Sequence, residues 1–253
     1  MKRILAIVLA GLYFTFGMLC PVNDLIVVAK SKKIPIAAGA PKYNPKKWNE
    51  EYSIMLYNCY AYAFNFFLNP LSNAPYDTVN IYGIQPGYFS CVSYNNQIID
   101  EGISVKSVIK RVKTDMKCIG YKIKRIKKNN LYKKTNSKKQ YLVYLQVTKN
   151  SKNKMVYNKK TKTAIKYHAD YHWYRQDRNG KWSHKRGTWA VCNTDSKGKS
   201  INNPQKAKKN YETSLFPYIP GGPPYEMHNG ILYSVKNVVE YNGNYGYYVI
   251  TKK

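Results

Sequence analysis

Apolar residues follow two helical patterns in the first half of the chain. In residues 103–116 they recur at intervals of three and four, which predicts an amphipathic helix with a Lys/Arg outer face. Residues 56–68 form a second helical pattern that stops at the Asn-Pro pair of residues 69–70. Residues 121–126 alternate between polar and apolar, and residues 141–147 are almost continuously apolar, so both segments are predicted to be strands.

The remaining segments complete this pattern. Residues 38–51, with two prolines, are predicted to be an extended lead-in, and residues 148–162 a polar stretch. Residues 170–185 indicate a hairpin, residues 188–195 another strand, and residues 230–251 a last strand pair. Two helices followed by a mostly antiparallel sheet predict the α+β fold class.

The predicted hairpin carries two histidines, although the chain has 4 in all. An Asn-Gly turn at Asn179 and Gly180 joins two aromatic strands, one with His172 and the other with His184. Cys59 stands at the head of the first predicted helix. A cysteine at a helix start and a histidine on a distant strand are the usual arrangement of a thiolate nucleophile and its base.

This pairing assigns roles in a hydrolytic reaction. The Cys59 thiolate would attack an amide carbonyl, with His172 as base and then as acid to the leaving amine. His184 is the alternative base, because strand alternation places both histidines on one sheet face. Asn193 or Asp195, one strand further on, would fix the imidazole tautomer. We expect Cys59 Sγ within about 4 Å of a His172 ring nitrogen.

Two further groups are predicted to complete the site. The backbone amide of Cys59, with the side chain of Asn58 or Gln85, would donate to the developing oxyanion. The helix start and a neighbouring imidazolium should lower the thiol pKa from about 8.5 into the range of about 3.5 to 7.5.

Five short motifs carry a resemblance to known proteins: residues 58–63 (Asn-Cys-Tyr-Ala-Tyr-Ala), 85–87 (Gln-Pro-Gly), 170–175, 182–185 (Trp-Ser-His-Lys) and 193–195. The chain resembles the papain-like cysteine peptidases, in particular the compact bacterial NlpC/P60 and CHAP branch, and a group of secreted bacterial proteins with these motifs. The resemblance implies a papain-like fold and a hydrolase for peptide or amide bonds, with a peptide or peptidoglycan-like substrate. The chain differs from NlpC/P60 proteins in having Asn rather than Asp before the cysteine.

The charge points to a second class of function. Lys and Arg number 42 against 13 Asp and Glu, which gives a formal charge of +29. Lysine predominates, which suits charge attraction but not bidentate base recognition, so nucleic acid is not the expected partner. An anionic wall polymer or an acidic membrane surface fits better, and a non-enzymatic basic binder is the alternative to the hydrolase. The lysines of residues 106–139 and 149–166 are expected to provide the attraction.

The N-terminus predicts export. A short basic region precedes an apolar run over residues 4–19, and small residues near 29–31 could accept a signal peptidase. We therefore expect a signal peptide over 1–31, an extended lead-in over 32–55 and a single α+β papain-like domain over 56–253. The protein would be secreted or held at the cell surface, with an uncleaved membrane anchor as the alternative.

Cysteine and histidine chemistry leaves two further alternatives. The mature chain would keep four cysteines, enough for two disulfides in an exported protein: Cys59, Cys91, Cys118 and Cys192. Donors for zinc are also present: His168, His172, His184, Cys192 and Asp195. Tight CxxC or HExxH spacing is missing from the sequence, so neither a metal nor a cofactor is predicted.

Overall fold

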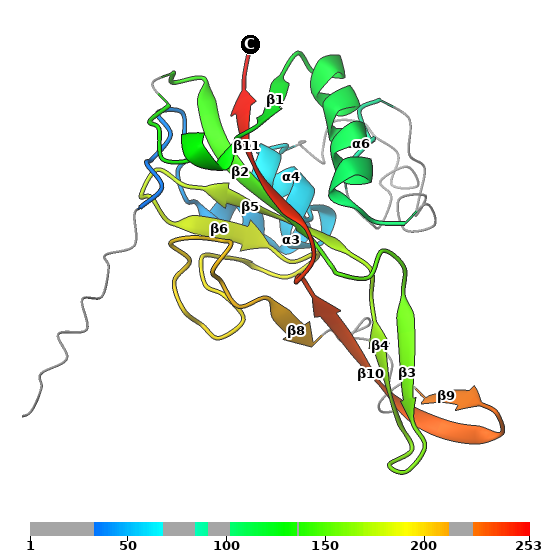
Figure 1. Ribbon diagram of the computed structural model, residues 1–253. Helices are drawn as coiled ribbons and strands as arrows, with labels where there is room; N and C mark the ends of the chain where they lie inside the picture. Colours follow the sequence, from blue (N-terminus) through cyan, green and yellow to red (C-terminus); the bar gives the residue numbers. More distant parts are fainter. Residues whose placement is uncertain (1–32, 68–83, 91–101, 136, 213–224) are drawn as a thin grey trace, which may run out of the picture. The chain divides into compact units, whose positions relative to one another are not determined.

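The computed structural model describes residues 33–67, 84–90, 102–135, 137–212 and 225–253. Lys33–Lys253 form one compact unit. The predicted signal peptide and Cys91 lie outside the described residues. Figure 1 shows the arrangement of the helices and strands of the described residues.

One sheet has six strands in the order β1-β11-β2-β5-β6-β7, and all of its pairings are antiparallel. Its strands are β1 (Lys122–Arg125), β2 (Gln140–Val147), β5 (Tyr171–Gln176), β6 (Trp182–Lys185), β7 (Val191–Cys192) and β11 (Tyr245–Thr251). The predicted hairpin is confirmed as β5 and β6, and its turn contains Gly180 with φ of 79°. The predicted strands at residues 121–126 and 141–147 are confirmed as β1 and β2.

A second sheet has five strands, of which β4 and β10 are parallel neighbours. Its strands are β3 (Lys154–Asn158), β4 (Thr163–Tyr167), β8 (Asn210–Glu212), β9 (Tyr225–His228) and β10 (Ile231–Glu240). Strand β3 lies inside the stretch that we predicted to be merely polar. The last two strands do not pair with each other, since β10 belongs to this sheet and β11 to the six-stranded sheet.

Within the described ranges, α6 (Val105–Cys118) is the one helix longer than two turns. The other described helices are α2 (Pro45–Asn49), α3 (Glu51–Leu56), α4 (Cys59–Phe64) and the 3-10 turn η2 (Lys128–Asn130). Helices α2 and α3 occupy part of the predicted extended lead-in. Asn44 caps the start of α2 and proline occupies its first position, so these residues favour a helix start.

Helix α4 carries Cys59 and is shorter than the predicted helix. Asn58 begins it by accepting hydrogen bonds from the amides of Tyr60 and Ala61. Asn65 ends it in the left-handed conformation, with φ of 57°. All six residues of α4 are buried, so the helix is held by packing rather than by its length.

Helix α6 is the predicted amphipathic helix. Its buried stripe includes Val108, Val112 and Met116, and Ser104 caps its start. Asp115 is also buried, and it accepts hydrogen bonds from the Tyr60 hydroxyl on α4. Helices α4 and α6 are therefore tied to each other.

The core lies between these helices and the six-stranded sheet. Trp173 on β5 contacts Phe64 on α4 at 4.9 Å and Tyr248 on β11 at 6.1 Å between ring centroids. Strand β2 is buried along almost its whole length, as expected for a central strand. The structure confirms the α+β class with mostly antiparallel sheets.

Candidate functional site

Cys59 lies in the first turn of α4, as predicted, but it is buried there. Its side chain is 7% exposed, and its Sγ atom donates to the main-chain oxygen of Tyr171 over 3.8 Å. Burial, and after it the Asp170 carboxylate, raises the pKa of the Cys59 thiol to about 12. The cost of desolvating a thiolate thus outweighs the favourable position at a helix start.

His172 and His184 share one face of the sheet, as alternation predicts, and this is the face that points away from α4. On β5, Trp173 points toward the helix and contacts Phe64. His172 and Tyr174 point to the other side, where both contact His184. Successive side chains of a strand point to opposite faces, so the helix and the histidines are separated by the sheet.

The structure therefore does not bring Cys59 and His172 together. Cys59 Sγ bonds to the backbone of β5 from the helix side, while His172 Nε2 lies 2.7 Å from His184 Nδ1 on the opposite side. A change of side-chain rotamer leaves both residues on their own side of the sheet. The Cys59–His172 dyad has no support in this geometry, and neither has a pairing of Cys59 with His184.

The two imidazoles form a hydrogen-bonded chain with a defined proton order. His184 Nε2 lies 2.9 Å from the main-chain oxygen of Thr194, which only accepts, so this nitrogen carries a proton. His184 Nδ1 then accepts from His172 Nε2. Burial has the largest effect on both rings. It lowers the pKa of His184 to about 4 and the pKa of His172 well below 6.5. Both rings are therefore neutral at pH 7.

Cys192 is the cysteine that the fold places beside a histidine. It lies opposite His184 in the pairing of β6 and β7, and its Sγ is 3.3 Å from His184 Nε2. That nitrogen already donates to Thr194, so in this tautomer it is not a base for the thiol. Sequence reasoning missed this contact, although the register of two short neighbouring strands determines it.

Asn193 and Asp195 do not orient the imidazoles. Asp195 accepts from the amides of Lys197, Lys199 and Lys208, so its carboxylate stabilises its own loop. Among the described residues, no hydrogen bond joins the side chain of Asn193 to either histidine. The main-chain oxygen of Thr194, the residue between Asn193 and Asp195, orients His184 instead.

Asn58 and Gln85 have structural contacts. Asn58 Oδ1 caps α4, so this oxygen faces the helix amides. Gln85 Oε1 accepts a hydrogen bond from the Tyr171 hydroxyl on β5. The main-chain oxygen of the same tyrosine accepts from the Cys59 thiol. These contacts begin α4 and tie the 85–90 turn to β5, so the amide oxygens of Asn58 and Gln85 serve the fold.

Cys59, Cys118 and Cys192 carry free thiols. In the described part of the chain, no group of three or more His, Cys, Asp or Glu side chains could hold a metal ion. His168, one of the predicted donors, bonds instead to Asn237 at 2.8 Å in the second sheet.

The thiols are expected to differ in reactivity. At neutral pH, iodoacetamide should modify Cys59 at least about tenfold more slowly than the exposed Cys118, because burial opposes the thiolate. Peptide mapping of a labelling time course would measure each rate. Rapid labelling of Cys59 with a midpoint below pH 8 would contradict the geometry described above.

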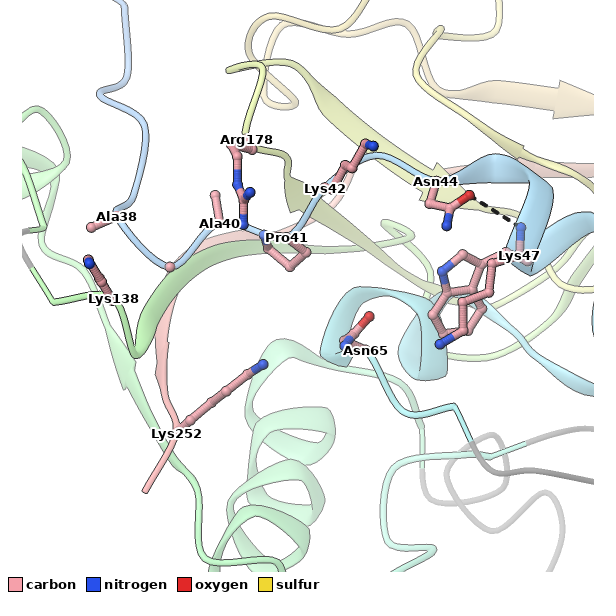
Figure 2. A pocket seen from close by; sticks show the side chains of 12 residues that line it. Ala38, Ala40, Pro41, Lys42, Asn44, Lys47, Asn65, Lys138, Arg178 and Lys252 are labelled. Carbon is pink, nitrogen blue, oxygen red and sulfur yellow. Dashed lines mark hydrogen bonds between the residues drawn. The ribbon is translucent and has the colours of Figure 1, made fainter. Parts of the chain in front are cut away.

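A second candidate is a basic cleft of about 710 Å³ (Figure 2). Five cationic side chains from four segments of the chain line it: Lys42, Lys47, Lys138, Arg178 and Lys252. Lys252 reaches toward Asn65, while Lys42 and Arg178 lie across the cleft from it. Lys47 is held over the ring of Phe67, 3.9 Å from its centroid. Sequence reasoning missed this cleft because its cations converge only in the folded chain.

No Asp or Glu is among the described residues that line this cleft. Three carboxylates elsewhere in the described part of the chain have partners outside the cleft. Asp170 accepts from Tyr241, Glu226 from Tyr157, and Asp177 pairs with the buried Arg175. The positive charge of the cleft is therefore not neutralised from within its walls.

Comparisons with known proteins give limited information. The chain is 41% identical over 54 residues to insoluble matrix shell protein 1 of Ruditapes philippinarum, which covers 21% of this chain and 36% of that protein. The chain thus spans about a third of the length of this relative. No family model matches, and no solved structure matches. Among the described residues, none of the helices has the length and apolarity required to cross a membrane.

Proposed function

We propose that this protein binds an anionic polymer outside the cell and that the basic cleft is its principal binding site. The observation that carries this proposal is the convergence of five cations on one cleft with no carboxylate among its described lining residues. Like charges so placed repel one another, which costs stability unless a ligand neutralises them. An anionic ligand would gain from all five.

The composition of the cleft favours a polyanion over a base-specific partner. Four of its cations are lysines, which act as mobile point charges, and Arg178 alone offers a planar fork. Such a set recognises repeated negative charge but not the edges of bases. The high net charge of +29 would add long-range attraction.

Export is part of the proposal. It is supported by the N-terminal basic and apolar pattern of the sequence. The name of the partial relative places that protein in a shell matrix, which is consistent with an extracellular role for the shared segment. This likeness extends over 21% of the chain, so the polymer itself is inferred from the cleft.

The hydrolase remains the alternative hypothesis. A papain-like architecture and peptidase or amidase activity follow from the motif resemblance, with Cys59 as the nucleophile. The raised pKa of the Cys59 thiol and its separation from both histidines do not favour this alternative. The basic cleft favours the binding of an anionic polymer over hydrolysis.

Binding should depend steeply on salt. Because exposed charges are screened within a Debye length, which falls from about 10 Å at 0.1 M to about 3 Å at 1 M salt, affinity should fall at least about tenfold over this range. Fluorescence titration of the intact protein with long-chain polyphosphate would measure it. Absence of binding at low salt, or binding that salt does not change, would contradict the proposal.

A further inference from the structure

A second basic cleft, of about 650 Å³, lies between α6 and strands β1 and β11. Its cationic lining residues are Lys106, Lys113, Lys124 and Arg125. Half-buried apolar side chains, among them Ile109 and Ile123, form another part of its wall. As in the first cleft, no carboxylate is found among the described lining residues.

Strand β11 connects the two clefts. Tyr248 lines the second cleft, and Lys252, just after the strand, lines the first. Residues two apart on a strand share a face, so Tyr248 and Ile250 point to the same side of the sheet. Lys252 Nζ lies 5.6 Å from the ring centroid of Tyr141, the partner of Ile250 on β2, so it is on this side too. The pairing of Ile250 with Ile123 on β1 places that side toward the second cleft. Both clefts therefore open on the helix-bearing side of the six-stranded sheet.

Strand geometry gives the spacing between one lining residue of each cleft. Lys252 is four positions after Tyr248, and an extended chain rises about 3.3 Å per residue, so the backbone atoms of these two residues lie about 13 Å apart. This distance exceeds the reach of one small anion but is short for a polymer. A flexible anionic chain could occupy both clefts at once.

We propose that the two clefts are subsites for one linear polymer of phosphate groups. This inference rests on the proposed function, and it adds a second site and a requirement for ligand length. Lysine and arginine both bind phosphate well, the former as point charges and the latter through paired N–H groups. Once the polymer occupies one cleft, the other meets it at a high effective concentration.

If both clefts bind one polymer, the affinity for polyphosphate should rise with the length of the polyphosphate, and this rise should require both clefts. Long-chain polyphosphate should bind at least about 100-fold more tightly than triphosphate, since bivalent contact raises avidity by about 10² to 10⁴. In Lys106→Gln/Lys113→Gln, long-chain affinity should fall at least about tenfold while triphosphate affinity at the first cleft changes little. Lys159→Gln/Lys160→Gln, with the same charge change on the turn between β3 and β4, is the matched control.

Isothermal titration of the full chain with triphosphate and with long-chain polyphosphate tests the inference. A loss confined to long chains in the second-cleft variant supports it. Equal losses in this variant and in the matched control, or a wild-type affinity that does not change with chain length, would overturn the two-subsite arrangement while leaving polymer binding intact. No binding of either ligand by the wild type would instead refute the proposed function.

Discussion

Lys185→Met is expected to lower the free energy of unfolding by about 3 kcal/mol or more. The Lys185 side chain is fully buried, and its Nζ donates to three main-chain oxygens at 2.7 to 2.9 Å, those of Ile54, Gly187 and Trp189. Methionine would leave three carbonyls without a donor, each at a cost of about 1 to 3 kcal/mol. Part of this is offset, because burying an ammonium is itself unfavourable.

Urea unfolding at pH 7 would measure the loss. Lys133→Met replaces an exposed lysine and should change stability by less than about 0.5 kcal/mol. A Lys185 variant as stable as this control would mean that the three contacts do not hold α3 and the 187–189 segment to β6. The three residues whose carbonyls Lys185 contacts do not line the basic cleft, so polymer binding by the folded variant should persist.

The protein should lose stability as the pH falls below about 6.5. His184 has its pKa lowered from 6.5 to about 4 by burial, so protons bind the unfolded chain more strongly than the folded one in this window. Its contribution is complete above pH 6.5 and is lost as the pH falls toward 4. From pH 7 to pH 5 the loss is about 2 kcal/mol for this residue. His172, also lowered, adds to it.

Asp170 acts in the opposite direction. Burial raises its pKa to about 6, so its penalty to folding is present above pH 6 and decreases as the pH falls toward 3.8. Between pH 7 and pH 5, the decrease in the Asp170 penalty offsets about the loss from one histidine, since one pKa unit corresponds to about 1.4 kcal/mol. Asp177, whose pKa is also raised by burial, acts like Asp170, whereas His168, whose pKa is lowered by burial, acts like His172 and His184. We expect a net loss because three histidines oppose two carboxylates.

Urea unfolding at pH 7 and pH 5 would show this dependence. In His184→Gln the difference between the two pH values should shrink by about 2 kcal/mol. His228→Gln, on the second sheet, should keep the wild-type difference. An unchanged difference in His184→Gln would show that the buried histidine pair does not titrate as its environment requires.

Much of the six-stranded sheet could be predicted from local sequence. The hairpin follows from aromatic alternation and an Asn-Gly turn, and α6 from its apolar stripe and Ser104 cap. Strand β3 was missed because Lys154 and Asn158 make its sequence polar, although Met155 and Tyr157 alternate toward the second core. The separation of β10 and β11 into two sheets is set by long-range pairing, which local patterns do not encode.

The candidate site shows the same division. Alternation correctly placed His172 and His184 on one face, but it does not say on which side of the sheet α4 packs. That depends on Trp173 and Phe64 meeting in the core. The basic cleft was beyond local patterns too, because Lys42, Lys138 and Lys252 are distant in the sequence.

The most direct test of the account is the affinity of a cleft variant for long-chain polyphosphate. In Lys42→Gln/Lys138→Gln/Lys252→Gln the affinity at low salt should fall by about 150-fold, at about 1 kcal/mol for each of the three lysines near an anionic surface. Lys159→Gln/Lys160→Gln/Lys197→Gln removes the same charge outside the cleft and should lose less than about threefold. Equal affinities in the two variants would contradict the claim that the cleft is the principal binding site.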